Sequence, residues 1–159
     1  MKKVVIFLVV ILCGCEMHFQ SEIGDGFDLY YGDFGYIYDT EAISNYIYKN
    51  IEYVSDISTG HIDEWQSPEL TDSIKQGDCD DKALLFINIG YIKLGNKYDL
   101  VGVQHDQYSR TIVGGNLPDH FLVYDRENDI YIEPNNNNVY YGIEIEYIYT
   151  FEELFPRAL

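Results

Sequence analysis

The apolar residues in the middle of the chain recur at helical spacing. A first helix is predicted over residues 40–54, with Asp39 or Thr40 as its cap, and it ends in the polar stretch 55–60. A second is predicted from about Asp80 to Leu94, before the stop signal Gly95-Asn96. The residues that form the two apolar faces are Ile43, Tyr46, Ile47, Ile51 and Val54, then Ala83, Leu84, Ile87, Tyr91 and Leu94. Each helix therefore needs a partner to pack against.

After the second helix the pattern changes to short apolar runs of strand length. The predicted strands are Leu100 to Gln104, His120 to Asp125, Ile130 to Glu133, and Val139 to Tyr149, the last in one or two pieces. The asparagines at 135–138 predict a turn, and residues 61–71 predict a polar connection. Helices that come first and hairpin-linked strands that come later favour an α+β fold over a parallel α/β sheet.

One predicted hairpin places an imidazole beside a carboxylate. Side chains alternate along a strand, so His120 shares a face with Leu122 and Tyr124. A turn of two or four residues between the strands puts Glu133 on that same face, together with Tyr131. The other face is then filled by the apolar residues Phe121, Val123, Ile130 and Ile132. His120 and Glu133 are therefore expected to be neighbours on adjacent strands.

The N-terminus has the pattern of an export signal. Met1–Lys3 is basic, and Val4–Leu12 is an apolar run far shorter than the roughly 20 residues that span a bilayer. Leu12-Cys13-Gly14-Cys15 then resembles the bacterial lipobox, which implies cleavage before Cys15 and acylation of that residue. We therefore expect a signal peptide over 1–14, an acylated tether over 15–38 and one domain over 39–159. An ordinary secretory peptide with incidental cysteines is the alternative.

The cysteine content and the net charge restrict the roles and partners that the chain is expected to have. If Cys13 is removed and Cys15 is acylated, Cys79 is left with no partner for an internal disulfide. A lone exported thiol indicates either reactivity or a small buried apolar residue. The formal charge is −17, and loss of Lys2 and Lys3 makes it −19. Such acidity argues against nucleic acid and against electrostatic binding to anionic lipid as partners.

The strongest candidate for chemistry is Cys79. It lies at the cap or first turn of the second helix, where backbone N–H groups and the helix dipole favour a thiolate. The carboxylates of Asp78, Asp80 and Asp81 disfavour the thiolate, so Cys79 needs a cationic partner. His120 is the candidate, with Glu133 fixing its tautomer. Helix capping by the aspartates and a structural role for the histidine are the alternatives.

The residues Gly77-Asp78-Cys79-Asp80-Asp81-Lys82-Ala83 resemble the nucleophile motif of the transglutaminase-like superfamily, especially its bacterial cysteine-peptidase branch. Asp119–Tyr124 is similar to the family's histidine strand, Tyr131–Pro134 to its acid strand, and Trp65–Glu69 to its upstream tryptophan segment. The resemblance implies a papain-like α+β core whose nucleophile helix packs on an antiparallel sheet. It also implies amide hydrolysis by Cys79, His120 and an acid, with a peptide or protein as the substrate.

The third member of this triad departs from the family pattern. Glu133 stands where the family usually has Asp, and its spacing from His120 is short. Asn135 or Asp125 is the alternative. The Cys79 N–H is a natural oxyanion donor, and Trp65 is either a second donor or plain core.

Calcium and a lid are two further expectations. Some peptidases of this branch bind calcium beside the nucleophile, and Asp78 and Asp80 match those positions. Calcium takes six to eight oxygen ligands, so these two residues form an incomplete set, and a solvated acidic turn is the alternative. No cofactor is otherwise required. The loop 105–119 is a candidate lid over the cleft.

Two functions from different classes follow. The first is a lipid-anchored, extracytoplasmic thiol acyl-transfer enzyme of the bacterial cell envelope, with a Cys79–His120–Glu133 triad. The second is a lipoprotein that retains the scaffold without catalysis and serves as a binding or assembly module. In the second case Cys79 is unreactive and does not depend on His120.

Overall fold

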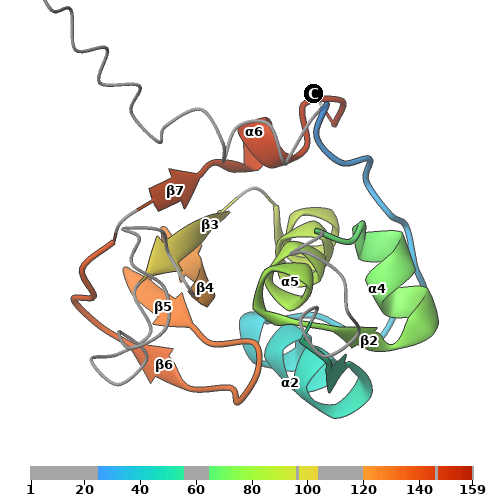
Figure 1. Ribbon diagram of the computed structural model, residues 1–159, viewed down its shortest axis with the longest axis horizontal. Coiled ribbons are helices and arrows are strands. Elements are labelled where there is room, and N and C mark those ends of the chain that lie inside the picture. The colour runs from blue at the N-terminus through green and yellow to red at the C-terminus, as the bar shows by residue number, and fades with distance from the viewer. Residues whose placement is uncertain (1–24, 56–64, 96, 104–119, 146, 159) are drawn as a thin grey trace, which may run out of the picture.

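The computed structural model describes residues 25–55, 65–95, 97–103, 120–145 and 147–158 (Figure 1). The helices are α2 (Thr40–Asn50), α4 (Pro68–Ile74), α5 (Cys79–Leu94) and α6 (Phe151–Leu154). The strands are β1 (Glu52–Tyr53), β2 (Gln76–Gly77), β3 (Tyr98–Val103), β4 (His120–Asp125), β5 (Ile130–Ile132), β6 (Val139–Tyr140) and β7 (Tyr147–Tyr149). This confirms the expected α+β class.

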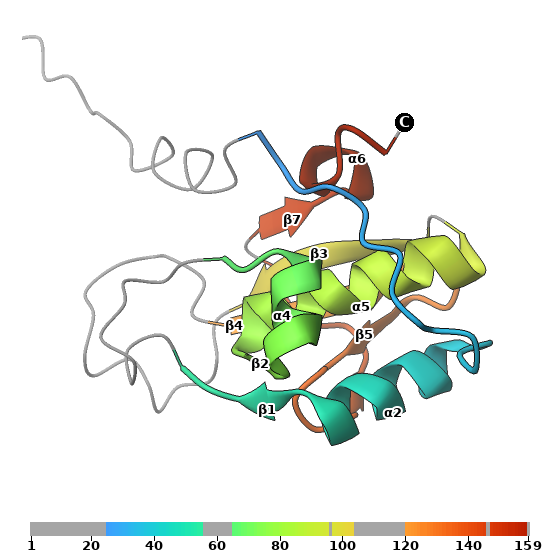
Figure 2. The same ribbon diagram turned by 90° about the vertical axis from the view of Figure 1, so that its right-hand side faces the viewer.

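The helix α5 forms the centre of the molecule. It lies between the large sheet on one side and the helices α2 and α4 on the other (Figures 1 and 2). Residues 80–90 are all buried, because the helix is apolar around most of its circumference from Ala83 to Ile89. Gly90 lies against the ring of Tyr98, where any side chain would collide with it. The helix therefore contacts β3 at close range and anchors the whole core.

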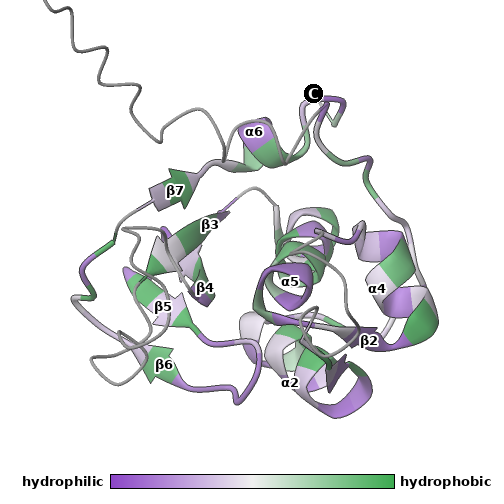
Figure 3. Ribbon diagram, in the orientation of Figure 1, coloured by the Kyte–Doolittle hydropathy of each residue, from purple (hydrophilic) through white to green (hydrophobic). Residues whose placement is uncertain are grey.

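The large sheet has five strands in the order β6-β5-β4-β3-β7, and all neighbouring pairs in it are antiparallel. Val123 pairs with Ile132 and Tyr124 with Tyr131, across a turn of four residues. Phe121, Val123 and Ile132 pack toward α5, whereas Leu122, Tyr124 and Tyr131 form a second apolar cluster. The predicted alternation of the hairpin is thus confirmed. Hydrophobic residues mark the central strands and α5 in Figure 3.

The segment before α2 belongs to the packed structure. Phe34 and Ile37 are core residues, although residues 15–38 were expected to form a tether. The Phe27 N–H donates to the Leu154 carbonyl oxygen at 2.7 Å, and Arg157 pairs with Asp28 at 2.6 Å. The domain boundary expected at residue 39 therefore lies inside the packed part of the chain. The apolar residues of this segment are isolated among glycines and acidic residues, so the sequence showed no periodic pattern that would predict its packing into the core.

Other differences from the expected elements are local. The helix α2 ends at Asn50, and the residues after it form β1, which pairs in parallel with β2. The helix α4 lies where a polar connection was expected, because Ser67 caps it and Pro68 occupies its first turn. The last expected strand forms two pieces, β6 and β7, as the sequence allowed, and α6, which was not expected, follows it.

Several expectations lie outside the described residues. These are the signal peptide over 1–14, Cys15 with its lipid, and the loop 105–119. Among the residues that the structure does describe, none of the helices has the length and apolar character needed to cross a bilayer.

A buried carboxylate joins three parts of this fold. Asp72 on α4 accepts hydrogen bonds from Tyr30 at 3.0 Å, from Lys75 at 2.5 Å and from Tyr46 of α2. Burial acts to raise the pKa of the Asp72 carboxyl, but the hydrogen bonds from Lys75, Tyr46 and Tyr30 outweigh it and hold the pKa below its usual value. The N-terminal segment, α2 and α4 therefore share one ionised acceptor.

We expect Asp72→Asn to lower the free energy of unfolding at pH 7 by about 1–3 kcal/mol, the usual cost of weakening hydrogen bonds to a buried charge. A carboxyl whose folded pKa is depressed contributes stability above its unfolded pKa, and this is lost as pH falls through the folded value. The difference between the two proteins should therefore shrink below about pH 4. Urea unfolding from pH 7 to pH 3 measures it. Asp33→Asn, at an exposed site, is the matched control, and an equal loss there would refute the assignment.

Candidate active site

The start of α5 is held by a fully buried carboxylate. Asp81 accepts the Gln66 N–H on Oδ1 at 2.6 Å and the Asp78 N–H on Oδ2 at 3.2 Å. It therefore joins the segment before α4 to the residue that precedes the nucleophile. Asp78 is the N-cap, and Cys79 is the first residue of the helix, as the sequence predicted. Asp81 thus has the helix-capping role that the sequence analysis gave as an alternative for the aspartates, and its bond to Gln66 was not predicted.

Gly77 is required by the same arrangement. A Cβ on this residue would lie 2.7 Å from the Asp81 Cβ and 3.2 Å from a methyl carbon of Thr71. Real Cβ atoms do not approach so closely, so any larger residue would displace Asp81. The glycine at the head of the motif therefore allows α5 to begin where it does.

His120 and Glu133 are hydrogen-bonded to each other. The bond joins His120 Nε2 to Glu133 Oε2, and the other carboxylate oxygen, Oε1, accepts the Asn135 N–H at 2.9 Å. Both side chains are largely buried. His120 opens β4 and Glu133 directly follows β5, which the pairing of Val123 with Ile132 brings side by side. The neighbour relation predicted from strand alternation is confirmed.

The two alternatives for the acid lie elsewhere. The Asp125 carboxylate is fully buried at the far end of β4, where it accepts the backbone N–H groups of Glu127 and Asn128 and closes the hairpin turn. Asn135 reaches Glu133 through its backbone N–H, and its side-chain oxygen is buried with no partner among the described residues. Of the three side chains, Glu133 is the one hydrogen-bonded to His120.

Cys79 lies beside the start of β4. The backbone N–H of Phe121, the residue after His120, donates to the Cys79 sulfur, and Glu133 is close enough for its charge to act on the thiol. Figure 2 shows the start of α5 at the same end of the molecule as β1 and the start of β4. The structure therefore gathers the three residues that the sequence proposed as a site.

The electrostatic surroundings of Cys79 oppose a resting thiolate. Burial raises the pKa of the thiol well above its ordinary value, and Asp80 and Asp78 raise it further. The Phe121 N–H lowers this pKa, and Glu133 raises it. Asp80 Oδ1 lies 3.9 Å from the sulfur, within reach of the S–H group. These contributions favour the neutral thiol, so Cys79 would need a base in order to act as a nucleophile.

Two residues of this region were missed in the sequence. Lys82 is almost fully buried, and its Nζ lies 5.8 Å from the centre of the Tyr53 ring. Burial lowers the pKa of Lys82, and the charge of Glu133 acts to raise it. Buried lysines are rare without a charge partner, so the burial of Lys82 marks it as unusual. The sequence shows this lysine in the motif but does not show that it is buried. Tyr53 gave no signal, since it is one of 16 tyrosines.

Trp65 packs as part of the core beside the site. Its ring contacts Phe121 and Tyr149 edge to face, with ring centres 5.2 and 5.6 Å apart. Its Nε1 is buried and has no hydrogen-bond partner among the described residues. The position of Trp65 is therefore consistent with both expected roles, as a core residue and as a hydrogen-bond donor to an oxyanion.

Asp78, Cys79 and Asp80 offer ligand atoms within 4.8 Å of one another. One oxygen of Asp78 is buried without a partner in the described part of the chain, which suits a cation. The third group is a thiol, however, and calcium prefers a larger set of oxygens. These residues alone do not fit calcium.

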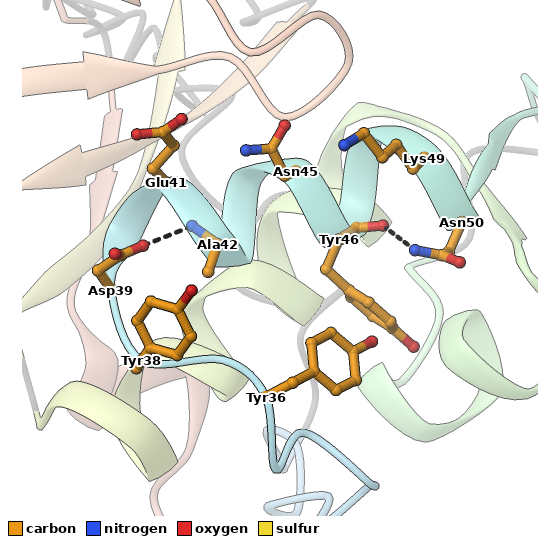
Figure 4. Close-up of a pocket in the computed structure, with 9 residues that line it drawn as sticks. All are labelled: Tyr36, Tyr38, Asp39, Glu41, Ala42, Asn45, Tyr46, Lys49 and Asn50. Atoms are coloured by element: carbon orange, nitrogen blue, oxygen red, sulfur yellow. Dashed lines mark hydrogen bonds between the residues drawn. The ribbon is translucent and has the colours of Figure 1, made fainter.

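An open hollow lies along α2 and shares no residue with this cluster (Figure 4). Its cavity volume is about 420 Å³. Asp39 in its wall accepts the Ala42 N–H at 2.7 Å, and Asn50 donates to the Tyr46 carbonyl oxygen at 2.7 Å. These polar groups stabilise the ends of the helix, so the hollow gives no reason to place the chemistry there.

No family model, curated protein or solved structure matches this chain.

We expect Gly77→Ala to destabilise the fold by about 1–3 kcal/mol, the usual cost of forcing extra atoms into a packed interior. It should also slow alkylation of Cys79, because the displaced Asp81 no longer holds the start of α5. Urea unfolding and the rate of iodoacetamide labelling measure the two effects. Gly35→Ala is the control, since its Cβ would meet its nearest neighbour at 3.6 Å. Equal behaviour of the two variants would contradict this role for Gly77.

Proposed function

We propose that the protein is a thiol acyl-transfer enzyme, a cysteine peptidase on a papain-like, transglutaminase-type core. The observation that carries the proposal is the hydrogen bond between His120 Nε2 and Glu133 next to Cys79 at the start of a buried helix. Such an arrangement leaves the second ring nitrogen, Nδ1, to exchange a proton with the thiol.

The reaction begins with attack of the Cys79 sulfur on an amide carbonyl carbon, while His120 accepts the thiol proton. Glu133 holds the imidazole in one tautomer and stabilises the imidazolium that forms. The Cys79 backbone N–H is among the first four of α5, which have no acceptor within a helix, so it can donate to the developing oxyanion. The C–N bond then breaks, and the amine leaves with the proton from His120.

The product of this first half is a thioester on Cys79. Hydrolysis by water, with His120 again as the base, completes a peptidase cycle. Transfer to an amine would complete a transglutaminase cycle. The motif resembles the peptidase branch more closely, so we propose water as the acceptor and a peptide or protein as the substrate.

The anchor is proposed from the sequence pattern. The short apolar run and the lipobox-like Leu12-Cys13-Gly14-Cys15 support cleavage before Cys15 and attachment of lipid there. The enzyme would then act in the bacterial cell envelope, on the extracytoplasmic side of a membrane. The acidity of the chain fits a catalytic domain held by lipid instead of by surface charge.

A non-catalytic scaffold is the second candidate function. The observation that favours it is the environment of Cys79, because burial and the Asp80 and Asp78 carboxylates raise the pKa of its thiol. A cysteine in such a place is inert unless a base acts on it. The two functions therefore differ in whether the reactivity of Cys79 depends on His120.

We expect Cys79 to react with iodoacetamide near pH 7.5, and His120→Ala to slow this by roughly 10²-fold or more, the lower end of general-base effects. Because the thiol pKa is raised, the variant should gain reactivity only as pH rises above the usual thiol range of about 8.5. Mass spectrometry of the full-length chain carrying Cys13→Ser and Cys15→Ser gives the rates from pH 6 to pH 10.

Glu133→Gln is expected to fall between the wild type and His120→Ala, since it keeps a hydrogen-bonding side chain but loses the charge. Asp125→Asn is the control, because that residue bonds the hairpin turn and not the imidazole. Identical profiles for the wild type and His120→Ala would support the scaffold function instead.

We expect EDTA to leave the alkylation rate of Cys79 unchanged, because Asp78 and Asp80 do not form a sufficient calcium site by themselves. The same labelling assay with EDTA and with added CaCl₂ measures this. A calcium-dependent gain in rate or melting temperature that disappears in the double variant Asp78→Asn, Asp80→Asn would show instead that calcium binds beside the nucleophile.

A further inference from the structure

Tyr53 is placed next to the nucleophile by a short parallel strand pair. It lies on β1 and pairs with Gly77 of β2, two residues before Cys79. The Val54 N–H donates to the Gly77 carbonyl oxygen at 3.2 Å, and the Glu52 N–H donates to that of Lys75 at 2.8 Å. The backbone of Tyr53 is therefore fixed on both sides against the segment that leads into α5.

The ring of Tyr53 lies on the face of α5 that carries Cys79. Lys82 is one helical turn after Cys79, and residues three apart share a helix face. The Lys82 Nζ is 5.8 Å from the centre of the Tyr53 ring, so the ring lies beside the end of this side chain. Tyr53 is 53% exposed, whereas Glu133 and Lys82 are almost fully buried. It is thus a site residue on the side that is open to solvent.

The phenol is surrounded by groups that keep it a hydrogen-bond donor. Burial raises the pKa of Tyr53 to about 12, and the carboxylates of Asp78, Asp80 and Glu133 act in the same direction. The hydroxyl therefore keeps its proton at neutral pH. The Lys82 ammonium lies near the ring, in cation–π contact with it.

A neutral hydrogen-bond donor is needed because the carboxylates of the site repel the oxyanion that forms in the reaction. Attack on a carbonyl carbon places a full negative charge on the carbonyl oxygen, here beside the carboxylates of Asp78, Asp80 and Glu133. The Cys79 N–H supplies one hydrogen bond to that oxygen. A second donor that carries no charge would offset the repulsion without becoming ion-paired to the nearby aspartates.

We propose that Tyr53 is a catalytic residue, the second donor of the oxyanion hole, whose hydroxyl hydrogen-bonds the carbonyl oxygen of the acyl group that is attacked by Cys79. This inference rests on the proposed acyl-transfer function. The S–C bond forms, the carbonyl π electrons move to oxygen, and the thiol proton passes to His120. Tyr53 donates a hydrogen bond throughout and transfers no proton. When the tetrahedral intermediate collapses, the C=O bond returns and the leaving group departs.

The test compares two reagents that use the same thiol. Acylation of Cys79 by p-nitrophenyl acetate passes through an oxyanion, whereas alkylation by iodoacetamide displaces iodide and forms none. In the full-length chain with Cys13→Ser and Cys15→Ser, Tyr53→Phe should slow acylation by roughly 10²-fold, the loss typical of one oxyanion donor. Its alkylation rate should match the unsubstituted protein. Release of p-nitrophenolate, corrected with Cys79→Ser, and mass spectrometry measure the two rates.

The control is Tyr48→Phe, which removes a hydroxyl from an equally exposed tyrosine on α2. It should change neither rate, and a melting curve verifies that both variants are folded. If Tyr53→Phe slows both reactions equally, Tyr53 acts on the thiol and the inference is overturned. It is also overturned if acylation is unchanged. A protein with Tyr53 intact that is alkylated but never acylated would refute the proposed function, and the role of Tyr53 with it.

Discussion

The geometry of this protein depends on two hydrogen bonds accepted by one buried side chain, Asp81. One of them holds the segment that leads into α4, and the other holds the residue before Cys79. Because an unpaired charge in such a place would cost several kcal/mol, both donors must stay in position when the helix forms. Gly77 leaves the space in which the carboxylate sits. The position of the thiol relative to β4 follows from this arrangement, since α5 cannot shift along the sheet without breaking it.

The site combines a nucleophile with surroundings that discourage its ionisation. Two carboxylates flank Cys79, and Glu133 adds a third negative charge nearby. The groups that act against this charge are the Phe121 N–H on the sulfur, the Lys82 ammonium and the N-terminus of the helix. A resting ion pair between thiolate and imidazolium is therefore disfavoured. If the protein is the proposed acyl-transfer enzyme, proton transfer at the moment of attack suits these charges, and the rate would depend on the orientation of His120.

Much of this could be predicted from sequence because the signals were local or periodic. The helices α2 and α5 follow from apolar spacing, and the pairing of His120 with Glu133 follows from strand alternation across one hairpin. The α+β class follows from the order of the elements. What the sequence did not show depends on contacts between distant segments. Phe34 packs against Tyr46 of α2, and Phe27 against Phe155 of the C-terminal segment.

The difference between local signals and distant contacts also explains which residues of the candidate site could be found from the sequence. Cys79 and His120 carry distinctive chemistry, and each stood at the start of a predicted element. Tyr53 has neither property: its strand has two residues, and only the parallel pairing with Gly77 brings it to the nucleophile. Lys82 could be identified as part of a motif, but its burial beneath Tyr53 required the fold. A pairwise contact made by a two-residue strand leaves no periodic trace in the sequence.

The burial of so many charged groups at one end of α5 is itself an argument for function. Asp78, Asp80, Asp81 and Lys82 are consecutive apart from Cys79 and are all buried in a small domain. Moving ions out of water costs several kcal/mol each, and apolar side chains of similar size usually serve stability as well or better. Asp81 has a structural reason, because it binds two backbone N–H groups. Asp78 caps the helix, and Asp78 and Asp80 flank Cys79. The pKa values of Cys79, Lys82 and Tyr53 are all shifted at this end of α5. Clusters of such shifted groups are typical of active sites, which supports the proposed enzyme over the inert scaffold.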